Sequence, residues 1–277
     1  MIANAALTAA LHHWGARAVP FSDDPANNPF VFPAWEHALG LLHQTAALRS
    51  VMLLSGDNGV GKSALLGHWR AALEPKAYLP LTFSHATLSG SSLLSVLLHK
   101  LGKRPSLFRS RNLTLLEEAL HELGRITPVL VLDEAQLYPL GALEEIRLLL
   151  GLNLARQPVF ALILAGDLYL PDTLRLQQHK ALYSRIAAHA QLGPIDRSQI
   201  ESFLLHGLRQ VGLERPCLAP AALDLLASAS AGLPRQLNLL ARGAWLAAAH
   251  AQANTIAPEH VQIALRTVPA AHDRITP

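Results

Sequence analysis

The feature that most constrains the fold of this chain is a glycine-rich segment at residues 55–63, which reads SGDNGVGKS. It contains the complete pattern GxxxxGK[ST] and lies between an apolar run and a helical pattern. The glycines allow the backbone to turn its N–H groups inward around phosphate oxygens, and the first turn of the following helix adds positive potential. We therefore expect a phosphate-binding loop formed by Gly56, Asp57, Asn58, Gly59, Val60, Gly61, Lys62 and Ser63.

Two side chains of this loop have distinct expected roles. Lys62 is expected to reach the β- and γ-phosphates of a nucleotide, and the Ser63 hydroxyl is expected to ligate Mg²⁺. The alternative is a glycine-rich turn that matches the pattern by chance. The position of the loop after a strand, together with a second motif downstream, argues against that alternative.

The second motif is an apolar run that ends in two carboxylates, PVLVLDE at residues 128–134. The end of a buried strand is where an acid can hold a metal-bound water, so Asp133 is the expected second metal ligand. Glu134 is then expected to polarise the attacking water as a general base. Without the upstream loop, a solvated strand end or a helix cap would be the better interpretation of this pair.

The first half of the chain alternates short apolar runs with longer helical patterns, which is typical of βαβ units and a parallel sheet. We expect strands at 50–54, 77–83, 129–132, 159–165 and 189–192, and helices at 63–73, 91–101, 113–123 and 142–150. After Gly193 the strand pattern stops, and helical patterns remain at 197–211, 220–230, 234–253 and 258–267. The expected fold class is therefore an α/β P-loop domain at residues 1–193, followed by a small all-helical lid domain at 194–277.

Composition excludes several other classes of protein. Hydrophobic residues make up 51% of the 277 residues and charged residues 16%, so the chain has enough apolar surface to fold. The single cysteine, Cys217, cannot form a disulfide within the chain. No apolar stretch approaches the roughly 18 residues of a membrane span, and no secretion signal is recognisable at the N-terminus, so we expect a cytoplasmic protein without a membrane partner. The histidines lack metal-ligand spacing, and we expect no zinc.

One basic segment suggests an anionic partner. Residues 75–116 contain no acid and carry six Lys and Arg residues, twice the net charge of +3 of the whole chain. Within it, the segment 100–112, KLGKRPSLFRSRN, is expected to be a loop because it contains proline and follows a helical pattern. The candidate contacts to a DNA backbone are Lys100, Lys103, Arg104, Arg109 and Arg111. The alternative is a solvated charged face.

Taken together, these motifs resemble the AAA+ ATPases. The resemblance rests on residues 56–63, on DEAQ at 133–136, on the polar strand end AGD at 165–167, and on GLPR at 232–235. Within that superfamily the chain is most similar to ExeA-type ATPases and to the transposon-borne ATPases of the TnsC, TniB and MuB kind. That likeness extends through LDEAQLYPLGALEEIRLL at 132–149, LYSRIAAHAQLGPI at 182–195 and GLPRQLNLLARGAWLAA at 232–248.

The resemblance implies roles for further residues. Arg235 matches the sensor-2 arginine that acts within the same subunit, and Arg185 matches the arginine finger that acts on a neighbouring subunit. Without the resemblance, each arginine would be interpreted as an ordinary surface residue. Asp167 stands where the family usually has Asn, Thr or Ser as sensor 1, so it either turns away from the phosphate, raises the pKa of a neighbour, or slows hydrolysis. Gln136 follows the acidic pair and is a candidate relay between a partner and Glu134.

In similar proteins the segment 21–35 covers the adenine, which makes Val31 and Phe32 candidate contacts. On its own this segment is expected to be irregular and packed on the sheet.

The resemblance also implies the function. We expect an ATP- and Mg²⁺-dependent ATPase, slow and stimulated by DNA or a partner, that forms a ring or helical filament on duplex DNA and regulates transposition with a transposase. One alternative is an ExeA-like secretion ATPase, and another is a P-loop kinase of a small molecule, against which the GLPR segment argues. The partner protein, the DNA target and the subunit number stay open.

Overall fold

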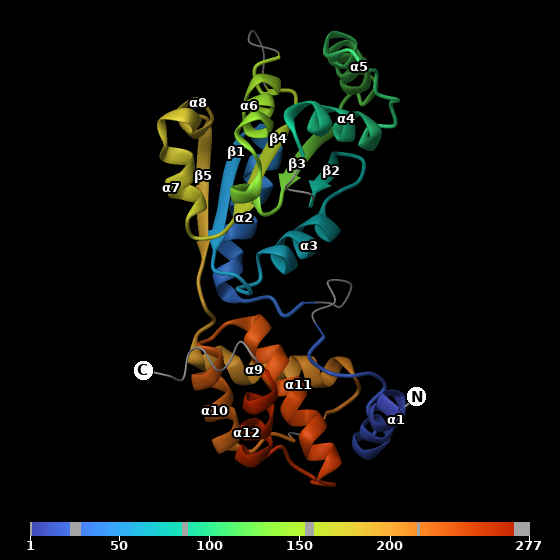
Figure 1. Cartoon of the computed structure of the whole chain (residues 1–277), viewed down its shortest axis with the longest axis vertical. Helices are drawn as coiled ribbons and strands as arrows, with labels where there is room; N and C mark the ends of the chain where they lie inside the picture. Colours follow the sequence, from blue (N-terminus) through green and yellow to red (C-terminus); the bar gives the residue numbers. More distant parts are fainter. Residues whose placement is uncertain (1, 23–28, 85–87, 153–157, 215–216, 269–277) are drawn as a thin grey trace. The chain divides into compact units, whose positions relative to one another are not determined.

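The computed structural model describes residues 2–22, 29–84, 88–152, 158–214 and 217–268. Five strands form one parallel sheet in the order β2-β3-β4-β1-β5, with bounds β1 Val51–Gly56, β2 Tyr78–Phe83, β3 Thr127–Leu132, β4 Ala161–Gly166 and β5 Ile186–Leu192 (Figure 1). The parallel α/β sheet expected from the sequence is confirmed. A feature that the sequence did not reveal is that β4 lies between β1 and β3.

Helices connect these strands, as parallel pairing requires. Their bounds are α2 Pro33–Leu48, α3 Lys62–Ala72, α4 Gly90–Lys100, α5 Arg109–Glu122, α6 Leu140–Leu149, α7 Leu170–Arg175 and α8 Lys180–Tyr183, with short 3₁₀ helices η1 Ala135–Leu137 and η2 Gln177–His179. Helix α2 packs across β5, β1, β4 and β3, and α4 packs against both α5 and α6.

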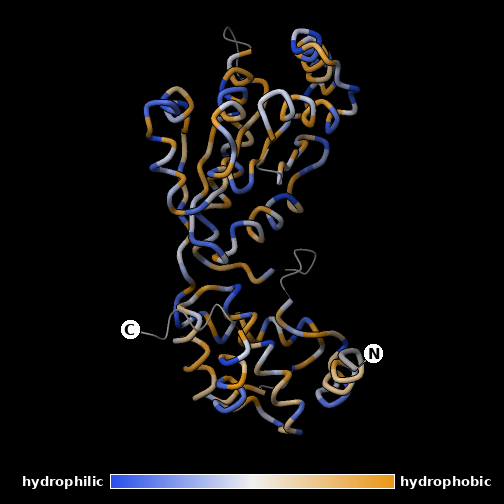
Figure 2. The backbone as a smooth tube through the Cα atoms, in the orientation of Figure 1, coloured by the Kyte–Doolittle hydropathy of each residue, from blue (hydrophilic) through white to orange (hydrophobic). Residues whose placement is uncertain are grey.

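The core explains why the strands read as continuous apolar runs. Leu53 of β1, Leu132 of β3 and Leu164 of β4 belong to one buried cluster with leucines of α4 and α6. The residues between them, such as Met52 and Ile163, are buried as well. Because successive side chains of a strand point to opposite faces, both faces of the sheet are covered at β1, β3 and β4, while alternate residues of the edge strand β5 are exposed. Figure 2 shows the resulting apolar character along the central strands.

The remaining helices form a second compact unit. It contains α1 Ile2–Trp14, α9 Arg197–Gln210, α10 Pro220–Ser230, α11 Pro234–His250 and α12 Pro258–Thr267. Helix α11 contacts α1, α10 and α12. The indole N–H of Trp14 donates to the carbonyl of Trp245 at 3.2 Å, and the two rings stack with their centroids 6.2 Å apart. The first helix of the chain is thereby fixed to the C-terminal helices.

The residue boundaries of the two units differ from those of the expected domains. One unit comprises Pro33–Asn58 and Lys62–Leu192, and the other comprises Met1–Phe32, Gly59–Gly61 and Gly193–Pro277. The domain bounds 1–193 and 194–277 stay a prediction. Within the described ranges, no helix is both long and apolar enough to span a bilayer.

Two expectations about local structure were wrong. The segment 100–112 is only partly a loop, because α4 extends to Lys100 and α5 begins at Arg109. The segment 21–35 is not irregular throughout, because α2 begins at Pro33 and carries the buried Trp35 into the unit of the sheet, whereas Phe30 and Phe32 lie 6.0 and 5.5 Å from the ring of Phe203 in α9. Both errors arose at residues whose partners are distant in sequence. Residues 23–28 lie outside the described residues.

Candidate nucleotide-binding site

The glycine-rich loop connects β1 to α3 and has the backbone shape that its sequence predicts. Gly59 and Gly61 have φ angles of +87° and +106°, which only glycine adopts readily. Helix α3 begins at Lys62, so the N–H groups of its first turn lie at the end of the loop. This is the arrangement that binds phosphate oxygens at a helix N-terminus.

Lys62 is buried, with 6% of its surface exposed. Its ammonium group donates to the carbonyl oxygens of Gly56 at 2.7 Å and of Asp57 at 3.2 Å. Burial lowers the pKa of Lys62 below its usual value, and the nearby carboxylates oppose that shift; in decreasing order they are Glu134, Asp133, Asp167 and Asp57. A buried cation surrounded by acids is thus held inside the loop, where a polyphosphate would give it a direct partner.

Ser63 and Asp133 meet although they lie on different elements. The Ser63 hydroxyl donates to the Asp133 carboxylate across 3.2 Å. A hydroxyl and a carboxylate oxygen are ligands that Mg²⁺ accepts, and Mg²⁺ at such sites takes few protein ligands and completes its shell with water and phosphate. The described residues contain no cluster of three or more His, Cys, Asp or Glu that would hold a metal by itself. The Ser63 hydroxyl and the Asp133 carboxylate, 3.2 Å apart, are donors that fit a phosphate-bound Mg²⁺.

Glu134 sits at a sharp turn between β3 and η1. Its backbone is left-handed, with φ 51° and ψ 45°, which is uncommon for a residue other than glycine. Its N–H donates to the Asp133 carboxylate at 3.0 Å, and its own carboxylate accepts from Gln136. Strained backbone of this kind concentrates at functional sites.

Asp167 follows β4, and its carboxylate is already engaged. One oxygen, Oδ1, accepts from the N–H groups of Tyr169 at 2.9 Å and Leu170 at 3.0 Å, where α7 begins. Of the three roles considered for Asp167, this geometry favours a carboxylate turned toward the helix that follows it. Asp167 still contributes negative potential at Lys62.

The two candidate arginines lie on different units. Arg185 precedes β5, and its guanidinium donates to the carbonyl of Leu150 at 3.2 Å. Arg235 is exposed in the first turn of α11, and its backbone N–H donates to the carbonyl of Gly59, which belongs to the same unit, at 3.2 Å. Neither arginine contacts Glu134 among the described interactions, so their roles stay predictions.

Tyr138 is a residue of this region that the sequence did not single out. It is buried, and its hydroxyl donates to the carbonyl of Phe83 at 3.1 Å. Burial first, and the Asp133 charge second, raise the pKa of Tyr138 to about 12. Tyr138 thereby ties the segment after β3 to the end of β2. Its position in the DEAQLY sequence was the only available signal.

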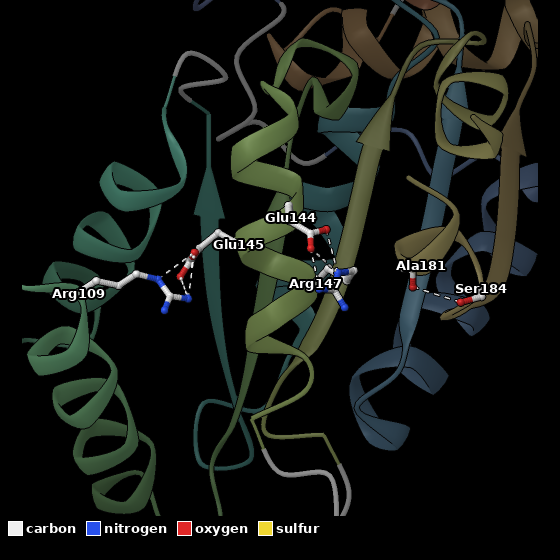
Figure 3. Close-up of polar contacts among 6 residues, drawn as sticks. All are labelled: Arg109, Glu144, Glu145, Arg147, Ala181 and Ser184. Atoms are coloured by element: carbon white, nitrogen blue, oxygen red, sulfur yellow. Dashed lines mark hydrogen bonds and ion pairs between the residues drawn. The ribbon is translucent and has the colours of Figure 1, made fainter. Parts of the chain in front are cut away.

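The basic segment is partly neutralised by acids from elsewhere in the fold. Arg109 forms a forked ion pair with Glu145 of α6, with nitrogen to oxygen distances of 3.1 to 3.3 Å (Figure 3). Lys103 pairs with Glu122 at 2.6 Å. The ammonium of Lys100 lies 5.6 Å from the centre of the Phe83 ring. Lys100, Arg104 and Arg111 are exposed and form no ion pair among the described residues, so the cations free to meet an anionic partner are fewer than the five that the sequence suggested.

The candidate adenine contacts differ in exposure. Val31 is 41% exposed, whereas Phe32 is 3% exposed and packs within the helical unit. Val31 is thus the more available of the two, and its role stays a prediction.

Comparisons with known proteins agree with this fold. Residues 46–174 match the family described as "AAA domain". The chain is 26% identical over 244 residues to General secretion pathway protein A of Aeromonas hydrophila, a match that covers 85% of this chain and 44% of that protein. The chain thus spans under half the length of this curated relative.

Solved structures show the same architecture. Cdc6p of Pyrobaculum aerophilum superimposes with a TM-score of 0.72 at 21% identity, covering 90% of this chain and 70% of that one. The ORC1 protein of Aeropyrum pernix, in complex with DNA, gives a TM-score of 0.67 at 21% identity, covering 88% of this chain and 68% of that one. The fold is therefore a P-loop fold of the AAA type with a helical C-terminal region. None of these three proteins is described as a transposition ATPase.

Proposed function

We propose that this chain is an ATPase that binds ATP with Mg²⁺ and assembles on duplex DNA in its ATP-bound form. The assembly recruits a transposase or another transposition protein in the cytoplasm, and hydrolysis dissolves it. Arg185 of one copy completes the site of the next, so the active form is a homo-oligomer, either a ring or a filament.

The observation that carries the ATPase proposal is the convergence of Lys62, Ser63, Asp133 and Glu134 around one loop. Bound Mg²⁺ neutralises charge on the phosphates during transfer. Ser63 and Asp133 hold that ion, Lys62 compensates phosphate charge, and Glu134 accepts a proton from the attacking water.

Two substitutions test the ATPase proposal. Lys62→Ala should abolish ATP binding, measured by equilibrium titration with a fluorescent ATP analogue. Glu134→Gln keeps the shape of the side chain but is a far weaker base, so it should retain binding and lower turnover by about 10²-fold or more. ATP turnover that survives in Lys62→Ala would contradict the proposal.

The DNA proposal rests on the exposed cations of the basic segment, of which Arg104 and Arg111 make neither an ion pair nor a ring contact among the described residues, and the likeness to a DNA-bound ORC1 fold supports it. Each phosphate contact releases counterions, so losing two contacts should reduce the slope of log affinity against log salt by about 2. We expect this reduction in Arg104→Gln/Arg111→Gln and none in Lys180→Gln, a substitution at an exposed cation outside the segment. Equal slopes in all three proteins would remove the segment from the interface.

A secretion-associated, ExeA-like ATPase is the second candidate, favoured by the similarity to General secretion pathway protein A. The two candidates differ in their response to DNA. The first candidate predicts that duplex DNA stimulates ATP turnover and that the protein accumulates on DNA in its ATP-bound state. The second predicts that DNA does not change the rate of ATP turnover.

A further inference from the structure

The amide of Gln136 connects two segments of the candidate site. Its nitrogen Nε2 donates to Glu134 Oε2 at 2.6 Å, and its oxygen Oε1 accepts from the backbone N–H of Asp167 at 3.3 Å. The orientation of the amide follows from its partners, because a backbone N–H only donates and an ionised carboxylate only accepts. One side chain thus joins the end of β4 to the expected general base.

The surroundings of this amide leave it little freedom. A Cβ atom on Gly166 would lie 2.5 Å from Gln136 Oε1 and 2.5 Å from Leu170 Cδ2. Glycine at 166 is therefore what allows the amide to approach the end of β4. Gln136 itself is half-buried in η1.

Asp167 does not make this connection through its carboxylate, since its Oδ1 is occupied by the N–H groups at the start of α7. Only its backbone N–H bonds to Gln136. The side chain that links the end of β4 to Glu134 is therefore that of Gln136, two residues beyond the acidic pair.

We propose that Gln136 is a positioning residue for ATP hydrolysis: its bridge from the Asp167 N–H fixes one carboxylate oxygen of Glu134 and leaves the other to take the proton of the attacking water. The inference rests on the proposed ATPase function and deepens it. Orientation matters because a general base must lie within hydrogen-bond reach of the proton that it removes. A loosely held carboxylate would visit that geometry less often.

Three substitutions remove the bridge in different ways. Gln136→Leu removes both bonds. Gln136→Glu keeps an acceptor for the Asp167 N–H but replaces the donor to Glu134 with a second carboxylate, which repels it when ionised. Gly166→Ala leaves Gln136 unchanged and displaces its amide. The exposed Gln177 of η2 provides the control substitution Gln177→Leu.

The test measures kcat for ATP and, separately, equilibrium affinity for a fluorescent ATP analogue. Each of the three bridge variants should lower kcat at least fivefold while nucleotide affinity changes less than twofold, and Gln177→Leu should change neither. A purely structural role would reduce affinity and kcat together.

A kcat in Gln136→Leu within fivefold of the parent value, or above it, would overturn the positioning role. A loss of affinity equal to the loss of kcat would overturn it as well. Failure of the ATPase proposal is distinguishable, because the parent protein itself would then neither bind nor hydrolyse ATP.

Discussion

Tyr138 is buried beside Asp133, and its protonation state affects folding stability. Burial and the Asp133 charge raise its pKa from 10.0 to about 12 in the folded protein. A raised phenol pKa means that the folded state favours the neutral form. The stability contributed by neutral Tyr138 is therefore complete below about pH 10 and is lost as the pH rises toward about 12.

This behaviour gives the first prediction. Tyr138→Phe removes the hydrogen bond to the Phe83 carbonyl and should lower the free energy of unfolding by about 1 kcal/mol at pH 7. The difference between parent and variant should shrink above pH 10, because only the parent has a phenol to ionise. Urea unfolding at several pH values measures it. A difference that stays constant to pH 11 would contradict the assigned cause.

The second prediction concerns Asp167, which accepts two backbone N–H groups at the start of α7. Asn keeps a side-chain oxygen for these donors, so Asp167→Asn should preserve the fold and hydrolyse ATP at least as fast as the parent. Asp167→Ala loses the acceptor and should cost about 1 kcal/mol of stability. A large loss of turnover in Asp167→Asn would show that the carboxylate charge itself is required.

At the scale of elements, α5 is held against α6 by the Arg109–Glu145 ion pair. Glu145 is 10% exposed and Arg109 is 50% exposed, measured over their side chains. Removing the arginine leaves a buried carboxylate without compensation, whereas removing the carboxylate leaves an arginine that water can still solvate.

The third prediction follows from this asymmetry. Arg109→Gln should destabilise the protein more than Glu145→Gln, and a double-mutant cycle should give a coupling of about 1 kcal/mol. Guanidinium chloride is itself a salt and would screen the ion pair, so urea is the denaturant for this measurement. Additive single effects would mean that the contact contributes no net stability.

Strands β1, β3 and β4 were predictable from sequence because strands buried on both faces are continuous apolar runs, whereas β2 and β5 are partly exposed. Residues 129–132 and 189–192 were placed within β3 and β5, with errors only at the ends. Helices α1, α2, α7 and α8 were missed, and the first turn of α5 was taken for a loop. Arg109 in this turn pairs with Glu145, which is 36 residues away, whereas Asn112 bonds to the backbone of Ser106, only six residues before it.

The same limit applies to the candidate site. The contact between Ser63 and Asp133 follows from two motifs that are each local in sequence. The bridge by Gln136 depends on a glycine and a backbone N–H about 30 residues further on, for which no local pattern exists. Sequence therefore indicated the residue types of the site better than their hydrogen bonds.

At the scale of the whole molecule, ligand binding should be visible as thermal stabilisation. ATP with Mg²⁺ at about 100 times its dissociation constant stabilises a folded protein by about 2.7 kcal/mol. We expect the melting temperature of the parent to rise under these conditions, and to fall back when EDTA removes the metal. Lys62→Ala should show no rise. An equal rise in parent and variant would mean that ATP binds elsewhere.

The tryptophans provide a way to assign such a transition. The chain has four tryptophans. Trp35 and Trp69 are buried in the α/β unit, and Trp14 and Trp245 stack in the helical unit. Because indole fluorescence changes when water reaches the ring, replacing one pair with phenylalanine leaves an intrinsic emission signal from the other unit alone. Two such proteins would reveal whether the units melt together or in sequence, without any attached dye.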